Sequence, residues 1–252
     1  MILHLALDEK FIDDAFKDFE YILPGKNILA VFSNTKKLKY IKYTKANFIL
    51  NPSIFNPQRL LKKIGNIDLI ISYSLFPSAI RVISYANSPV LWLGFGYDYY
   101  TLISENQYSL FLNKTASLYN EFIEFNKLQN KTLKSRIKQF IKILISIFTD
   151  NKQQFSIPQL IQSEKINFFA PVIKPEYDLL KSKLMLDKFP EYTNFSFSSS
   201  FASNEEFYSK ININGKNILL GNSASFTNNH IEAIDIIAKN ITNKDRKIIT
   251  PL

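Results

Sequence analysis

The most informative stretch of the sequence is Asn217-Ile218-Leu219-Leu220-Gly221-Asn222-Ser223-Ala224-Ser225-Phe226-Thr227-Asn228-Asn229-His230. It opens with an apolar run, continues through small polar residues, and leads into a second apolar pattern that extends to Ile237. This order predicts a strand, a loop and a helix. A loop of this kind points several backbone N–H groups at one spot, on the positive end of a helix dipole, which suits a phosphate or diphosphate.

The residue types of this loop fit that ligand. Gly221 permits a tight turn and a close approach of the backbone, while the Asn and Ser side chains add hydrogen-bond donors. Asn229 and Glu232 have the spacing of a capping box. The residues expected to bind a diphosphate are Gly221, Asn222, Ser223, Ser225, Asn229 and His230. A well-capped strand-to-helix turn without a ligand is the open alternative.

Strands and helices alternate in the rest of the chain, which predicts an α/β protein with a parallel, Rossmann-like sheet. The expected strands are residues 2–7, 27–32, 67–72, 90–93, 167–170, 194–198 and 216–220. The expected helices are residues 10–21, 57–63 and 77–85. We expect a first domain at 1–213 and the first strand-helix-strand of a second one at 214–252. That second unit is short, which suggests a shortened chain, although it could also extend the first sheet.

Composition narrows the class of protein. The 252 residues are 46% hydrophobic and include no cysteine, so we expect a globular protein without disulfides or thiolate metal sites. No signal peptide or spanning helix is expected. Two separated histidines make a poor metal site, and no Walker loop or Gly-x-Ser-x-Gly motif is present. The net charge of +9 favours acidic partners, although a lysine-rich composition bias explains it equally well.

Residues 131–148 combine helical apolar spacing with basic side chains and contain no acidic residue. A basic amphipathic helix can lie on an anionic membrane surface. The residues expected to face the membrane are Lys134, Arg136, Lys138 and Lys142. An ordinary core-facing helix with a solvated basic side remains the alternative.

A loop with two glycines and a carboxylate follows the strand at 90–93. Ligands of open α/β sheets bind beyond the carboxyl ends of the strands, so Asp98 is a candidate general base. His4, inside the first strand, is a second candidate base, although a hydrogen-bonded core histidine is the simpler interpretation. Asp98 could instead be a helix cap, with the neighbouring tyrosines as packing groups.

Three sequence blocks resemble the TDP-N-acetylfucosamine:lipid II N-acetylfucosaminyltransferases, the 4-acetamido-4,6-dideoxygalactose transferases of bacterial polysaccharide assembly. The first block is residues 218–224 followed by 228–233, and the second is Ile2-Leu3-His4 with Lys10-Phe11-Ile12. The third has the pattern Trp-x-x-Gly-x-Asp-x-Tyr, matched by Trp92, Gly96, Asp98 and Tyr100.

The resemblance implies a GT-B glycosyltransferase with two Rossmann-like domains and no metal or other cofactor. The nucleotide-diphosphate sugar would bind the carboxy-terminal domain. An undecaprenyl-diphosphate-linked saccharide would bind the amino-terminal domain near Gly94, Gly96, Tyr97 and Tyr100. The enzyme would be peripheral on the cytoplasmic face of the inner membrane, and would not bind nucleic acid.

This chain departs from the resemblance in having a short second domain, in carrying Ser72-Tyr73-Ser74 where a His-Gly pair is expected, and in a long basic segment at 131–148. A non-catalytic membrane-binding module, or an inactive fragment of such an enzyme, is the alternative function. Nucleic-acid binding is a third possibility, disfavoured because the basic residues look dispersed rather than grouped with aromatic platforms.

Overall fold

The computed structural model describes residues 1–103, 111–129, 155–195, 215–220, 229–240 and 246–249. The chain divides into two compact units. The first comprises Met1–Ile103 and Gln153–Glu205, and the second comprises Ser104–Lys152 and Glu206–Leu252. No helix in the described ranges combines the length and the apolar character needed to cross a membrane.

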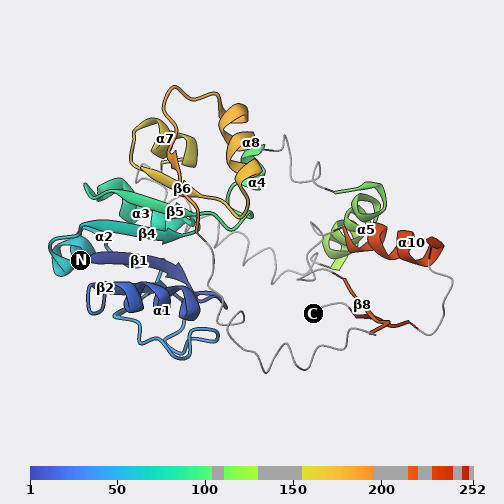
Figure 1. The fold of residues 1–252 in the computed structure, drawn as a ribbon, viewed down its shortest axis with the longest axis horizontal. Helices are drawn as coiled ribbons and strands as arrows, with labels where there is room; N and C mark the ends of the chain where they lie inside the picture. The colour runs from blue at the N-terminus through green and yellow to red at the C-terminus, as the bar shows by residue number, and fades with distance from the viewer. Residues whose placement is uncertain (104–110, 130–154, 196–214, 221–228, 241–245, 250–252) are drawn as a thin grey trace. The chain divides into compact units, whose positions relative to one another are not determined.

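The first unit is an α/β fold with a seven-stranded sheet in the order β3-β2-β1-β4-β5-β6-β7 (Figure 1). Every neighbouring pair of strands is parallel, so the sheet is Rossmann-like. The strands are β1 (Ile2–Leu7), β2 (Asn27–Phe32), β3 (Phe48–Leu50), β4 (Leu69–Tyr73), β5 (Val90–Leu93), β6 (Phe168–Ala170) and β7 (Glu191–Tyr192). Its helices are α1 (Ile12–Ile22), α2 (Pro57–Ile64), α3 (Pro77–Tyr85), α4 (Tyr100–Ile103), α7 (Ile157–Gln162) and α8 (Lys174–Leu184).

Side chains of β1 alternate between the two faces of the sheet. Leu3 and Leu5 belong to the core that α2, α3, α7 and α8 cover. Ala6 belongs to the opposite core, with residues of α1 such as Phe16 and with Ile41 from the β2–β3 connection. Figure 1 shows α1 along that second face. The connection after β2 therefore helps α1 to close one side of the sheet.

Most strands expected in the first unit are confirmed, and β1, β2 and β5 have the expected bounds. The strand expected at residues 194–198 is wrong for Asn194 and Phe195, because β7 lies earlier in the chain. The Glu191 N–H donates to the Asn167 carbonyl oxygen and fixes β7 beside β6. The sequence reading also missed β3, a three-residue edge strand.

The second unit contains β8 (Ile218–Leu219), α10 (His230–Asn240) and β9 (Ile248–Ile249), with β8 and β9 parallel. This strand-helix-strand is the one that the sequence predicts. Helix α5 (Asn113–Gln129) also belongs to this unit, and Lys114 forms an ion pair of 2.7 Å with Asp235 of α10. The expected boundary at residues 213 and 214 lies outside the described residues.

Candidate functional site

The strand order of the first unit reverses between β1 and β4. The chain proceeds from β1 to β2 on one side of this point, and from β4 to β5 on the other. Open α/β sheets bind ligands at such a switch point, outside the carboxyl ends of the strands. Glu9 follows β1 there, Ser74 follows β4, and Tyr97 lies in the loop after β5.

These three side chains form a hydrogen-bonded row. The Tyr97 hydroxyl donates to Glu9 Oε1 across 3.5 Å, and the Ser74 and Tyr97 hydroxyl oxygens are 2.6 Å apart. Because Tyr97 donates to Glu9, Ser74 donates to Tyr97. Ser74 is buried, whereas Tyr97 is 52% exposed. An exposed phenol therefore joins a buried hydroxyl to a carboxylate at the switch point.

The surroundings of Glu9 favour a proton acceptor. Its partial burial raises the pKa of the Glu9 carboxyl, and the negative charge of Asp98 raises it further. The hydrogen bond from Tyr97 works in the opposite direction, because it stabilises the charged carboxylate. Partial burial of its hydroxyl also raises the pKa of the Tyr97 phenol, which therefore remains a donor. A carboxylate whose pKa lies closer to neutrality is a better general base.

Ser74 has a backbone φ of +67°, in the left-handed region that serine seldom occupies. Two contacts hold it in this conformation. Its N–H donates to the Leu93 carbonyl at 2.8 Å, and the Ser72 hydroxyl donates to the Ser74 carbonyl at 2.6 Å. Backbone strain that the surrounding structure maintains is concentrated at functional sites, so this observation supports a role for the row.

The geometry does not support Asp98 as a base, because its oxygens are occupied. Oδ2 accepts the Trp92 indole N–H at 2.7 Å and the Leu75 backbone N–H at 3.0 Å, and Oδ1 accepts the Phe95 N–H at 3.1 Å. The side chain is only 8% exposed. Burial raises the pKa of Asp98, and the donors offset part of that effect. Asp98 therefore organises the loops after β4 and β5 and positions Tyr97.

The two loop glycines have structural roles. At Gly94, an added Cβ would lie 2.6 Å from Tyr99 and 2.7 Å from Phe169. At Gly96 the backbone φ is +89°, and an added Cβ would lie 2.8 Å from the Tyr100 ring. The Tyr100 hydroxyl donates to Glu176 of α8 at 2.6 Å. The residues of the Trp-x-x-Gly-x-Asp-x-Tyr pattern therefore stabilise the conformation of this loop.

His4 is also unsuited to be a base, because it is fully buried beneath α1. Its Nε2 lies 3.0 Å from Asn27 Oδ1 and its Nδ1 lies 3.1 Å from the Tyr73 hydroxyl. Since an amide oxygen only accepts, Nε2 carries the proton and Nδ1 accepts from Tyr73. Burial lowers the pKa of His4 to about 4. The core-histidine interpretation fits this arrangement.

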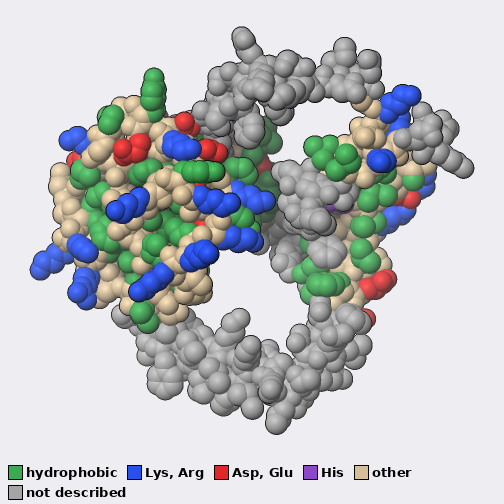
Figure 2. Space-filling model, turned by 90° about the horizontal axis from the view of Figure 1, so that it is seen from below, with side chains coloured by type: hydrophobic (Ala, Val, Ile, Leu, Met, Phe, Trp, Pro, Cys, Tyr) green, Lys and Arg blue, Asp and Glu red, His purple; other side chains and the backbone are tan. Residues whose placement is uncertain are grey.

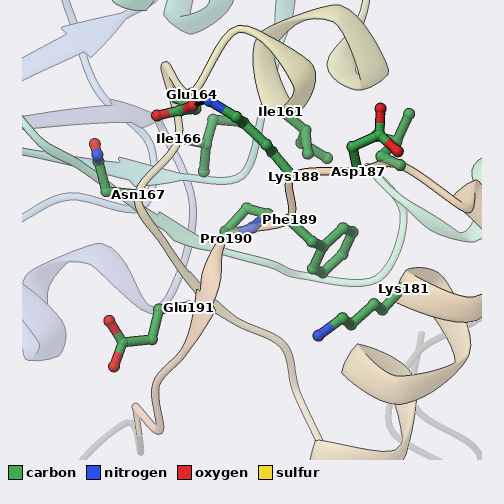
Figure 3. A pocket seen from close by; sticks show the side chains of 11 residues that line it. Ile161, Glu164, Ile166, Asn167, Lys181, Asp187, Lys188, Phe189, Pro190 and Glu191 are labelled. Carbon is green, nitrogen blue, oxygen red and sulfur yellow. Dashed lines mark ion pairs between the residues drawn. The ribbon is translucent and has the colours of Figure 1, made fainter.

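Gly94 also lines a pocket of about 410 Å³ at the carboxyl ends of β5, β6 and β7. Leu93, Ala170 and Phe195 line it as well. A second pocket, of about 490 Å³, lies at the amino ends of β6 and β7, with an ion pair between Lys188 and Glu164 at its rim (Figure 3). Only the first of these two pockets lies at the edge where open α/β sheets bind ligands.

The turn between β1 and α1 is unsuited to a diphosphate. Its residues, Asp8-Glu9-Lys10-Phe11, include no glycine. Asp13 and Asp14 add negative charge to the first turn of α1, which disfavours an anion there. Within the described residues, no group of three His, Cys, Asp or Glu side chains could hold a metal ion.

Two residues of the expected diphosphate site are described, both in the second unit. Asn229 Oδ1 accepts the Leu112 N–H at 2.7 Å, and Glu232 accepts the Thr115 N–H at 2.8 Å. These side chains therefore cap the amino end of α5, although Asn229 precedes α10 and Glu232 lies in its first turn. Of the polar atoms buried within the described part, His230 Nε2 has no hydrogen-bond partner. The other expected diphosphate and membrane residues, Gly221, Asn222, Ser223, Ser225, Lys134, Arg136, Lys138 and Lys142, lie outside the described residues.

The sequence reading missed Glu9 and Ser74 as site residues. The switch-point rule could have indicated them, since each lies two residues after an expected strand, but strand order is not visible in a sequence. A scan against protein-family models and searches of curated proteins and solved structures gave no match to this chain.

Proposed function

We propose that the protein is a GT-B glycosyltransferase and that its first unit binds the acceptor sugar. The observation that carries this proposal is the row of Glu9, Tyr97 and Ser74 at the switch point. A carboxylate with a raised pKa beside two hydroxyl groups suits a sugar hydroxyl that must be both hydrogen-bonded and deprotonated.

In the proposed reaction, Glu9 removes the proton of the acceptor hydroxyl while its oxygen attacks the anomeric carbon of the donor. The bond between that carbon and the diphosphate oxygen breaks, and the nucleoside diphosphate leaves with the electron pair. Tyr97 orients the Glu9 carboxylate, and Asp98 positions Tyr97 through the loop that it organises. Glu9 thus takes the role that the sequence suggested for Asp98 or His4.

The donor diphosphate is proposed to bind the segment that begins at Gly221, which belongs to the second unit and lies outside the described residues. The acidic, glycine-free turn after β1 supports donor binding by the second unit and acceptor binding by the first. A Rossmann-like sheet usually binds phosphate at this turn, and its residues here do not suit an anion. The amino-sugar donor, the polyprenyl-diphosphate-linked acceptor and the cytoplasmic membrane face come from the sequence resemblance and remain part of the proposal.

The test is a transfer assay with the full chain. A panel of nucleoside-diphosphate sugars is combined with polyprenyl-diphosphate-linked saccharides, and mass spectrometry follows the gain of one sugar. Glu9→Gln should lower kcat at least about 100-fold, the usual contribution of a general base. Glu191→Gln, at the amino end of β7, is the matched control and should leave the rate unchanged. Absence of product with every pair, or wild-type turnover by Glu9→Gln, would contradict the proposal.

A further inference from the structure

The connection between β2 and β3 carries an unusual concentration of positive charge. Residues 35–45 read Thr-Lys-Lys-Leu-Lys-Tyr-Ile-Lys-Tyr-Thr-Lys, with five lysines and no acidic residue. We call this segment the basic loop. All five lysines are exposed. Figure 2 looks at the first unit from the side where α1 lies in Figure 1, and Lys and Arg outnumber Asp and Glu on this face.

Two aspartates hold the backbone of the basic loop in one conformation. The Asp8 carboxylate accepts the N–H groups of Lys39, Tyr40 and Ile41. The Asp13 carboxylate accepts those of Lys42, Tyr43 and Thr44. Six consecutive N–H groups thus point inward, and the Ile41 side chain is buried in the core.

This anchoring leaves the lysine side chains available. Burial alone would raise the pKa of Asp8 and Asp13, but the backbone donors outweigh it and hold both pKa values below the ordinary range. Both carboxylates are therefore ionised, and their oxygens accept hydrogen bonds from backbone N–H groups of the loop. Among the described residues, none of the five loop lysines forms an ion pair with a carboxylate, and Asp14 pairs with Lys17 of α1. Glu20 lines the pocket beside the loop, but its two oxygens accept from the Gly25 N–H and the Asn27 amide.

Aromatic rings lie among these charges, so the expectation that the basic residues are dispersed and not grouped with aromatic side chains is wrong for this loop. The Lys39 ammonium lies 4.7 Å from the centre of the Tyr40 ring, and the Lys17 ammonium lies 5.0 Å from that of Tyr43. Tyr43 is 80% exposed, and Phe11, at the start of α1, is 56% exposed. Lys17 and Tyr43, with Lys45 of the loop, also line an open pocket of about 620 Å³.

We infer that the basic loop, together with Lys10, Phe11 and Lys17, is a docking surface for a bilayer of anionic lipids. Lysines beside exposed aromatic side chains suit the headgroup region, where the charges meet phosphates and the rings lie at the interface. The open pocket is large enough to take a headgroup phosphate between Lys17 and Lys45.

The same features argue against a nucleic acid as the partner. Single-stranded nucleic acids stack their bases on open aromatic faces. Here lysine ammonium groups lie over the rings of Tyr40 and Tyr43. The exposed Phe11 side chain gains burial in a lipid interface. This inference rests on the membrane location within the proposed function and assigns it to a surface outside residues 131–148; because flotation requires no sugar transfer, it can fail or succeed separately from the transfer assay.

The experiment is vesicle flotation of the full chain with phosphatidylcholine alone and with phosphatidylcholine containing phosphatidylglycerol. The variant Lys37→Gln/Lys39→Gln/Lys42→Gln removes three loop charges. The control, Lys62→Gln/Lys181→Gln/Lys183→Gln, removes three exposed charges from α2 and α8. Circular dichroism verifies that both variants fold.

The wild type and the control should bind the anionic vesicles and not the neutral ones. The loop variant should bind about 100-fold more weakly, since each lysine near an anionic surface contributes about a fivefold factor. Equal losses in both triple variants, or no flotation of the wild type, would overturn the inference. So would binding of an oligonucleotide, but not of vesicles, that depends on the loop lysines.

Discussion

The Trp92 indole N–H donates a hydrogen bond of 2.7 Å to Asp98 Oδ2, and both side chains are buried. Trp92 is on β5, whereas Asp98 lies in the following loop and also accepts the Leu75 N–H from the loop after β4. One carboxylate thus ties two loops to the strand beneath them. The loop that carries Tyr97 depends on it.

We expect Asp98→Ala to destabilise the first unit by about 3–5 kcal/mol, because two buried donors and one part-buried donor lose their acceptor. Asp98→Asn retains one acceptor oxygen and should cost less. Trp92 is the single tryptophan of the chain, so its fluorescence during urea unfolding reports on this unit. The control Asp178→Asn, an exposed carboxylate on α8, should change the midpoint little. A stable Asp98→Ala variant would remove the positioning role.

Gly94 should tolerate alanine far less well than Gly25. At Gly94 the new methyl group would lie within 2.7 Å of the Tyr99 and Phe169 rings, whereas at Gly25 it would meet no heavy atom within 4 Å. Gly25 has a positive φ, so its alanine variant reports the conformational strain alone. Overpacking at Gly94 is expected to cost about 1–3 kcal/mol. Urea unfolding compares the two variants, and equal midpoints would contradict the packing argument.

The fold of the first unit could be read from the sequence because short apolar runs alternate with amphipathic ones. The bounds of β1, β2 and β5 follow directly from such runs. The site could not be read in the same way, since it depends on strand order. Glu9 and Tyr97 are 88 residues apart and meet only because β1 is placed beside β4.

Long-range capping also escapes sequence patterns. The spacing of Asn229 and Glu232 predicts a cap on their own helix. In the structure their side-chain oxygens accept from Leu112 and Thr115, which are 117 residues away. A local sequence pattern indicates which side chains are hydrogen-bond acceptors, but tertiary packing determines which donors lie within reach of them.

The Thr115–Glu232 contact should protect the start of α5 from hydrogen exchange. Glu232 accepts both the backbone N–H and the hydroxyl of Thr115. We expect Glu232→Ala to speed amide exchange in the first turn of α5, because a terminal N–H loses its acceptor. Asp235→Ala, which removes the neighbouring ion pair with Lys114, should leave the Thr115 amide slow. Unchanged exchange of Thr115 in Glu232→Ala would contradict the cap.

His4 should make the stability of the first unit depend on pH. Its folded-state pKa is about 4, compared with 6.5 for an ordinary histidine. Below pH 6.5 the His4 imidazole is protonated in the unfolded chain but stays neutral in the folded chain. The free energy of unfolding therefore falls as the pH decreases towards about 4. The full loss is about 3 kcal/mol.

Unfolding free energies measured by Trp92 fluorescence across this pH range test the assignment. His4→Gln should flatten the dependence between pH 6.5 and the range where carboxylates begin to titrate. The matched control is His230→Gln in the second unit, which should keep the wild-type slope. A wild-type slope in His4→Gln would show that another group is responsible.

The pKa of Glu9 should rise further when Tyr97 loses its hydroxyl. The Tyr97 hydrogen bond stabilises the ionised carboxylate and lowers the Glu9 pKa, while burial and Asp98 raise it. In Tyr97→Phe only the raising effects remain, so the carboxyl should titrate at a higher pH than in the wild type. Carbon-13 NMR of the Glu9 carboxyl measures this midpoint without an enzymatic assay.

If Glu9 is the base, the acid limb of the kcat/KM profile should move in the same direction, because the active form is the ionised carboxylate. Tyr21→Phe, at an 89% exposed position on α1, should leave both measurements unchanged. An unchanged or lowered midpoint in Tyr97→Phe would show that the 3.5 Å contact does not act on Glu9. If the NMR midpoint shifts but the kcat/KM profile does not, the Tyr97–Glu9 contact is supported and Glu9 is not the base of the proposed reaction.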